Sequence, residues 1–163
     1  MYTFKISFEI SPSDLACPLG VEVWVDQQQI FNTEHLAATV NISHDIDENN
    51  AEHELRVVLK HKKTEHTTVD ADGNITQDAV INVGSFKFGV IDVNQLVQDL
   101  AIYTHNFNGS GDTTQSKFFG SMGCNGTVSL KFTTPVWFWL LEKIYNTSLK
   151  FTTPVFPLFT PGW

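Results

Sequence analysis

The sequence predicts an all-β protein, an antiparallel β-sandwich of the jelly-roll type with one short C-terminal helix. Many short segments alternate apolar and polar residues with a period of two, as strands do when they bury one face. Clusters of Gly, Pro, Asn and Asp separate these segments. Only residues 136–145 are apolar and long enough to indicate a helix. With 163 residues and a formal net charge of −8, the chain has the size of one domain.

The opening strand is the clearest, because the apolar residues of the segment 2–10 all fall on one face. In the next strand, residues 21–25, three valines alternate with Glu22 and Trp24. Residues 90–100 are compatible with a strand that ends in a helical turn. We expect further strands at residues 30–31, 37–42, 54–60, 67–69, 75 onward, 79–83, 85–88, 102–103 and 127–132, with tight turns at 26–29 and 70–74 and a long polar surface loop at 105–117.

Pro135 suits the first turn of the expected helix. On either side of this helix the chain repeats itself, because the eight residues 129–136 recur letter for letter as residues 148–155. We therefore expect a single sandwich domain at residues 1–145, followed by a duplicated tail at residues 146–163.

Composition excludes several classes of partner. The chain has no apolar run of about 18 residues, so we expect no membrane-spanning helix. Its N-terminus lacks the apolar block of a signal peptide, and we expect synthesis in the cytoplasm. Arg56 is the single arginine, which argues against nucleic acid as a partner. Cys17 and Cys124 lack metal-ligand spacing and are expected to be free buried thiols, although they could also meet in the fold.

The sequence contains no catalytic signature. It lacks a nucleophile elbow, a phosphate-binding loop and a dinucleotide fingerprint, and its six histidines have no metal-ligand spacing. We therefore expect a protein that is not an enzyme and needs no cofactor.

Calcium is the one metal that the sequence suggests. Asp70 and Asp72 lie in a turn that superficially resembles a calcium loop, and Asp45 and Asp47 form a second acidic cluster. If the two clusters meet, their carboxylates could hold Ca²⁺. The alternative is a plain hairpin turn at residues 70–74 and a solvated acidic stretch.

An exposed aromatic ring on a sandwich is a typical binding surface for a sugar. Trp24 lies on the polar face of its strand and is the best candidate, unless both faces of that strand are buried. Tyr103, His105 and Phe107 lie beside the expected long loop and are weaker candidates.

Four segments, residues 11–24, 51–56, 103–109 and 122–135, together resemble a family of small proteins encoded by T4-like marine cyanophages. This resemblance covers most of residues 1–142 and implies a phage protein made in the cytoplasm of the host, as a virion component or an accessory protein. It implies no activity and no site residues. Relatives end soon after the expected helix, so the second copy of the repeat is extra. The order of segments in residues 20–95 is also similar to that of jelly-roll modules that bind polysaccharides.

These observations favour a non-catalytic phage-encoded β-sandwich that binds a surface glycan or a protein partner. One alternative is a hydrolase that acts on a glycan through acidic residues near the long loop. A second is a purely architectural subunit.

The repeat predicts a homo-oligomer. Leu149 and Phe151 have the spacing of Leu130 and Phe132 in the first copy, so the second copy suits the same strand position. Phe156 and Trp163 add apolar anchors. We expect residues 146–163 to pack against the domain or against a partner chain.

Overall fold

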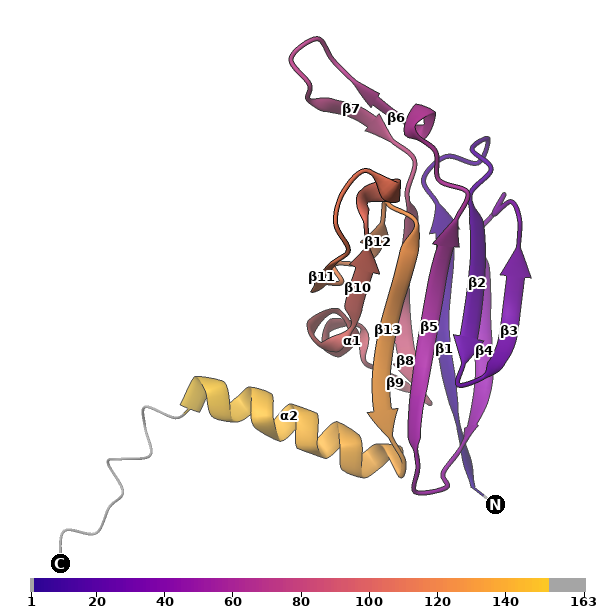
Figure 1. Cartoon of the computed structure of the whole chain (residues 1–163). Coiled ribbons are helices and arrows are strands. Elements are labelled where there is room, and N and C mark those ends of the chain that lie inside the picture. Colours follow the sequence, from indigo (N-terminus) through magenta and orange to yellow (C-terminus); the bar gives the residue numbers. More distant parts are fainter. Residues whose placement is uncertain (1, 153–163) are drawn as a thin grey trace, which may run out of the picture.

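The computed structural model describes residues 2–152, and it describes the side chains of residues 2–146. Two antiparallel sheets pack face to face as a sandwich, with a helix that leaves one end (Figure 1). The expected fold class, an antiparallel β-sandwich with a C-terminal helix, is confirmed.

One sheet has five strands in the order β12-β8-β1-β4, with β9 paired to β8, and the other has six in the order β11-β10-β13-β5-β2-β3. A separate hairpin, β6–β7, projects from the end opposite to the helix (Figure 1). The strands are β1 (Thr3–Pro12), β2 (Gly20–Val25), β3 (Gln28–Thr33), β4 (Val40–Asp47), β5 (Glu52–Lys60), β6 (Thr67–Val69), β7 (Ile75–Asp78), β8 (Ile81–Phe88), β9 (Ile91–Asp92), β10 (Ile102–His105), β11 (Thr114–Lys117), β12 (Ser121–Met122) and β13 (Gly126–Thr133). The helices are α1 (Asn94–Leu100) and α2 (Val136–Thr152), with two 3-10 turns, η1 (Thr64–His66) and η2 (Phe107–Gly109).

The core follows from the alternation in the sequence. Ile6, Phe8 and Ile10 of β1 are buried between the sheets, and the valines of β2 are buried on the facing sheet. Each buried strand side chain removes apolar surface from water, at roughly 1.5–3 kcal/mol per large side chain.

Three elements differ in type or extent from the expectation. The polar stretch 105–117 is a hairpin connection that includes η2 and β11, and is not one long loop. The strand expected at residues 37–42 continues further than expected. As β4 it runs to Asp47, and Ile46 is buried between the exposed Asp45 and Asp47. Residues 94–100 form a complete helix, α1, which packs beside β8 and β11.

The first residue of β13 is a glycine for a steric reason. A Cβ atom on Gly126 would lie 2.2 Å from the carbonyl oxygen of Thr104 in the neighbouring strand β10. No other residue fits there unless the two strands move apart, so this contact fixes how β13 enters the sheet.

The first part of helix α2 covers aromatic core residues at one end of the sandwich. The carboxylate of Glu48 accepts a hydrogen bond from the backbone N–H of Val136 at 2.8 Å and so holds the start of the helix. Trp139 is buried and its ring lies 5.9 Å from Phe88 and 6.1 Å from Phe132. Beyond this first part the helix runs away from the sandwich (Figure 1). No helix among residues 2–152 is both long and apolar enough to cross a bilayer.

The second copy of the repeat has a different backbone from the first. Residues 129–133 lie in β13, whereas residues 148–152 continue α2, so the helix is longer than expected. The expected tail contacts of Leu149, Phe151, Phe156 and Trp163 lie outside the described side chains.

Candidate functional site

The outer face of the six-stranded sheet carries a row of polar side chains around Trp24. In the strand register, Trp24 of β2 is paired with Arg56 of β5, and Arg56 with Ser129 of β13. The neighbours Val23 and Val25 point into the core, so Trp24 points outward and is half-buried. The indole therefore lies on the face that the alternation of β2 predicts.

Contacts with its neighbours hold the Trp24 ring in place. Its Nε1 donates a hydrogen bond to Glu22 at 3.0 Å, and this bond lowers the pKa of the Glu22 carboxyl below its ordinary value. The guanidinium of Arg56 lies 5.4 Å from the ring centroid, at cation–π distance. The ring thus forms a fixed flat surface.

Glu54 extends this row toward α2. Its carboxylate accepts a hydrogen bond from Ser129 Oγ at 2.9 Å. It also forms an ion pair with Arg56, whose Nε lies 3.2 Å from Oε1 but is not aligned for a hydrogen bond. Arg56 instead donates from Nη2 to the carbonyl oxygen of Asp26 at 3.0 Å, which connects the row to the β2–β3 turn.

A second cluster surrounds Asp26 in that turn. Asp26 has a φ of 53°, a left-handed conformation that Asp tolerates and that suits a tight hairpin. Its carboxylate lies 2.8 Å from His53 Nδ1 and accepts the backbone N–H of Glu54 at 2.9 Å. On the other side of the imidazole, Nε2 lies 2.9 Å from Asn49 Oδ1, which also accepts a hydrogen bond from Thr134 Oγ1 at 3.1 Å.

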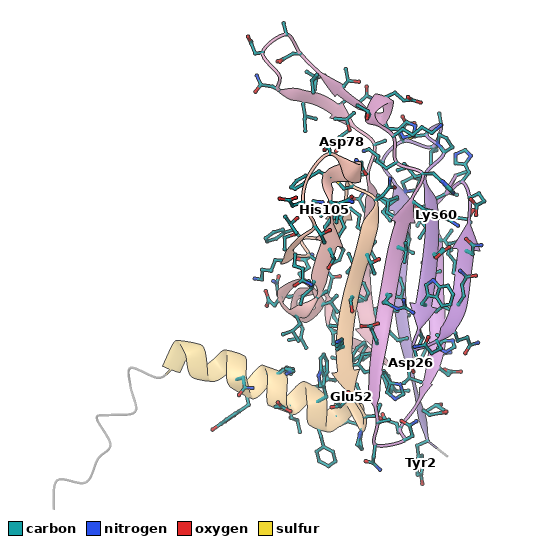
Figure 2. All side chains as sticks on the ribbon, viewed as in Figure 1. Tyr2, Asp26, Glu52, Lys60, Asp78 and His105 are labelled. Carbon is teal, nitrogen blue, oxygen red and sulfur yellow. The ribbon has the colours of Figure 1, made fainter. Side chains whose placement is uncertain are left out.

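A set of adjoining hollows, which we call the end groove, lies beside these clusters, and it is lined by Asp26, His53 and Glu54 but not by Trp24 or Arg56. It consists of three adjoining hollows of about 550, 420 and 430 Å³. The first and second hollows share Asp26, Gln27 and His53, and the second and third share Glu54 and Lys131. Figure 2 shows Asp26 and Glu52 at the end of the sandwich near the N-terminus.

The end groove is lined mainly by polar side chains and is acidic. Its lining includes the carboxylates of Asp26, Asp45, Asp47, Glu52 and Glu54, the amides of Gln27, Gln28, Asn49 and Gln115, the imidazoles of His44 and His53, and the ammonium groups of Lys131 and Lys143. Such a surface offers both hydrogen-bond donors and acceptors.

The opposite end of the sandwich holds a closed cluster, which we call the lysine network. The fully buried Lys62 ammonium donates to the Asp78 carboxylate and to the Ala79 carbonyl oxygen. Asp78 also accepts from Thr67 Oγ1 at 2.7 Å, and Asn125 bonds both backbone groups of Lys62 at 2.8 and 2.9 Å. These bonds join the β6–β7 hairpin to the sandwich.

Tyr103, His105 and Phe107 form a chain of rings beside the lysine network and away from Trp24. Their ring centroids are 4.7 Å apart in each successive pair. Tyr103 is buried, and its hydroxyl donates to the carbonyl oxygen of Cys124 and accepts its N–H at 2.9 Å. Burial raises the pKa of Tyr103 to about 12. Since Tyr103 packs in the core, only Phe107 of the three offers a largely exposed ring.

The four aspartates suggested for calcium do not come together. Asp45 and Asp47 lie in β4, where Asp47 is opposite Thr3 near the N-terminus, and Asp70 and Asp72 lie in the β6–β7 hairpin at the other end (Figure 1). Asp70 accepts hydrogen bonds from backbone N–H groups of its own turn, and the one from Asn74 lowers the pKa of Asp70. Within residues 2–152 no three His, Cys, Asp or Glu side chains are grouped as metal ligands.

Both cysteines are free. Cys17 is buried and Cys124 is half-buried, and burial raises the pKa of each thiol. The alternative that they pair in the fold is therefore not what the structure contains.

Sequence reasoning missed the centre of the end groove. Asp26 and His53 are 27 residues apart and meet because β2 and β5 are neighbours in the sheet. The aspartate in the expected tight turn at 26–29 was the only local signal. Glu54, Ser129 and Lys131 looked like ordinary outward residues of their strands.

Comparisons with known proteins found little. No protein-family model matches the chain, and no curated protein matches it. A solved structure described as "vCBM60 in complex with galactobiose", a carbohydrate-binding module, is similar with a TM-score of 0.42 and 15% sequence identity. The match covers 77% of this chain and 95% of that chain.

Proposed function

We propose that the protein binds a neutral glycan in the end groove and does not cleave it. The observation that carries the proposal is the groove itself, a set of adjoining hollows at whose centre the side chains of Asp26, His53, Asn49 and Glu54 are held by hydrogen bonds. Such preorganised sites lose little conformational entropy when a ligand binds.

The chemistry of the lining suits a sugar. A sugar hydroxyl both donates and accepts hydrogen bonds, and the carboxylates, amides and imidazoles of the groove supply partners for both roles. Next to them, the Trp24 ring offers a flat apolar surface for a pyranose face. Five carboxylates against two lysines would repel a sulfated or uronic glycan, so the proposal is restricted to neutral sugars.

The hydrogen bonds argue against a catalytic role for Asp26 and Glu54, the two carboxylates at the centre of the groove. A glycosidase needs one carboxyl group that is free to donate a proton to the leaving group. In the groove, Asp26 accepts from the backbone of Glu54, and Glu54 accepts from Ser129. These carboxylates support the framework, and a role in binding follows more directly than a role in catalysis.

A glycan array with neutral and anionic oligosaccharides tests the proposal. A neutral hit is then measured by calorimetry with Trp24→Ala, next to the groove-lining Val25, and with Phe119→Ala, an exposed aromatic residue in the segment after β11. We expect Trp24→Ala to weaken binding by about tenfold, or about 1.4 kcal/mol, and Phe119→Ala to leave it unchanged.

Two results would contradict the proposal. One is an array with no neutral hit, and the other is release of reducing sugar from the bound glycan. The second result would instead support the hydrolase.

We also propose that the protein is a phage-encoded virion or accessory protein, made in the cytoplasm of the host. The support is the resemblance of the four segments at residues 11–24, 51–56, 103–109 and 122–135 to cyanophage proteins. Mass spectrometry of purified virions is the test. Presence in the virion together with an empty glycan array would favour the architectural alternative.

A further inference from the structure

Helix α2 carries a stripe of large apolar side chains that nothing in the described chain covers. Trp137, Phe138, Leu141, Ile144 and Tyr145 are each between 54% and 72% exposed. We call these five residues the α2 stripe. Exposed apolar residues that lie singly are normal, but five on one helix form a contiguous patch that indicates an interaction surface.

The stripe lies opposite to the face by which α2 contacts the sandwich. Successive helical residues are rotated by about 100°, so all five side chains fall within about 60° of Leu141. Val136, Trp139 and Leu140, which are buried, fall on the other side of the helix. The sandwich therefore leaves most of the stripe uncovered while it holds α2 in this position, although Ile144, at the edge of the stripe, lines a hollow beside α1 together with Leu140.

The spacing of the stripe is symmetric about its centre. Relative to Leu141 the apolar residues stand at −4, −3, 0, +3 and +4. Two helices related by a two-fold axis run antiparallel, and the residue at one offset then faces the residue at the opposite offset. Leu141 would meet its own copy, Trp137 would face Tyr145, and Phe138 would face Ile144.

We propose that the α2 stripe pairs with the same stripe of a second copy of this chain, antiparallel about Leu141. Five large side chains with these exposures present on the order of 700 Å² per chain, close to the roughly 800 Å² per partner of a standard stable interface. No member of the stripe is charged.

A charge exchange at the two-fold axis tests the pairing directly. Light scattering after size exclusion should give the full chain a mass of twice 18.3 kDa. Leu141→Glu should give the mass of one chain, because two carboxylates would meet at the axis, and Leu141→Lys should do the same. An equimolar mixture of the two variants should recover the double mass, which a misfolded variant could not do. Phe119→Glu, at an exposed site elsewhere, should keep the double mass.

Several outcomes would overturn the proposal. They are a full chain that stays single at concentrations of tens of micromolar, a Leu141→Glu variant that keeps the double mass, and a mixture that stays single. A chain that ends after Thr152 tests whether residues 153–163, rather than a second copy, cover the stripe. We expect it to keep the double mass. If the full chain is single and only the shortened chain associates, then residues 153–163 cover the stripe and the proposal is wrong.

Discussion

Each end of the sandwich holds an aspartate paired with a buried nitrogen-bearing side chain, and the two pairs lie in different surroundings. In the lysine network, Lys62 is 0% exposed and its partner Asp78 is 28% exposed. In the end groove, His53 is 8% exposed and its partner Asp26 is 45% exposed. Each pair joins a turn to the sheets, and both carboxylates line a hollow, but Asp78 is the less exposed of the two and bonds a fully buried ammonium. The comparison teaches that the burial of the two partners sets how strongly the fold depends on such a pair.

The largest expected effect is that of removing the charge of Asp78. Asp78→Asn leaves the buried ammonium of Lys62 without its counter-charge and should lower the free energy of unfolding by about 3 kcal/mol. The matched exchange Asp26→Asn, at the more exposed pair, should cost only about 1 kcal/mol. Urea denaturation of both variants measures the difference. Equal costs at the two ends would show that burial does not separate them.

A smaller effect concerns pH at the closed end. The unfolded chain loses the phenolic proton of Tyr103 near pH 10, whereas the folded protein keeps it to about pH 12. Between these values the unfolded state binds fewer protons, so the free energy of unfolding falls as pH rises, by about 2.5 kcal/mol over the two units. The Tyr103→Phe variant has no phenolic proton, so its free energy of unfolding should lack this part of the decrease with pH. Urea denaturation of both proteins at pH 9.5 and 11.5 gives the two slopes, and parallel slopes would contradict the assignment.

The smallest expected effect is that of calcium, which we expect to be nil at both ends. Asp45 and Asp47 lie at one end and Asp70 and Asp72 at the other, so four carboxylates cannot share an ion. Melting temperatures in millimolar Ca²⁺ and in EDTA should agree. A rise with calcium would reveal binding to the folded state, and repeating the measurement with Asp45→Asn and with Asp70→Asn would identify the end responsible.

Strands with one buried face could be predicted from the sequence, and strands without one could not. β1 and β2 were found because Ile6, Phe8 and the valines alternate with polar residues. All four residues of β11 are exposed, so the strand carries no alternation and looks like a loop. β4 was shortened for a different reason, since Asp45 and Asp47 beside the buried Ile46 concealed a real alternation.

Within the candidate site, the sequence predicted the orientation of one side chain well, but it did not predict which side chains come together. The outward position of Trp24 followed from strand parity alone. The pairing of Asp26 with His53, and of Glu54 with Ser129, depends on which strands are neighbours, and no local pattern determines that order. Tyr103 was a candidate because it lies beside the expected long loop, whereas in the structure its ring is buried and its hydroxyl bonds the backbone of Cys124.

The close contact at Gly126 also bears on how the duplicated segment folds. The residue 19 positions later is Tyr145, so the second copy cannot enter the sheet by the route of the first without a clash at Thr104. The eight letters at 129–136 and 148–155 are the same, yet residues 129–133 are strand and residues 148–152 are helix. During synthesis the first copy also leaves the ribosome earlier, and domains fold as their chain emerges. The absence of a side chain at residue 126 thus favours the first copy over the second as strand β13.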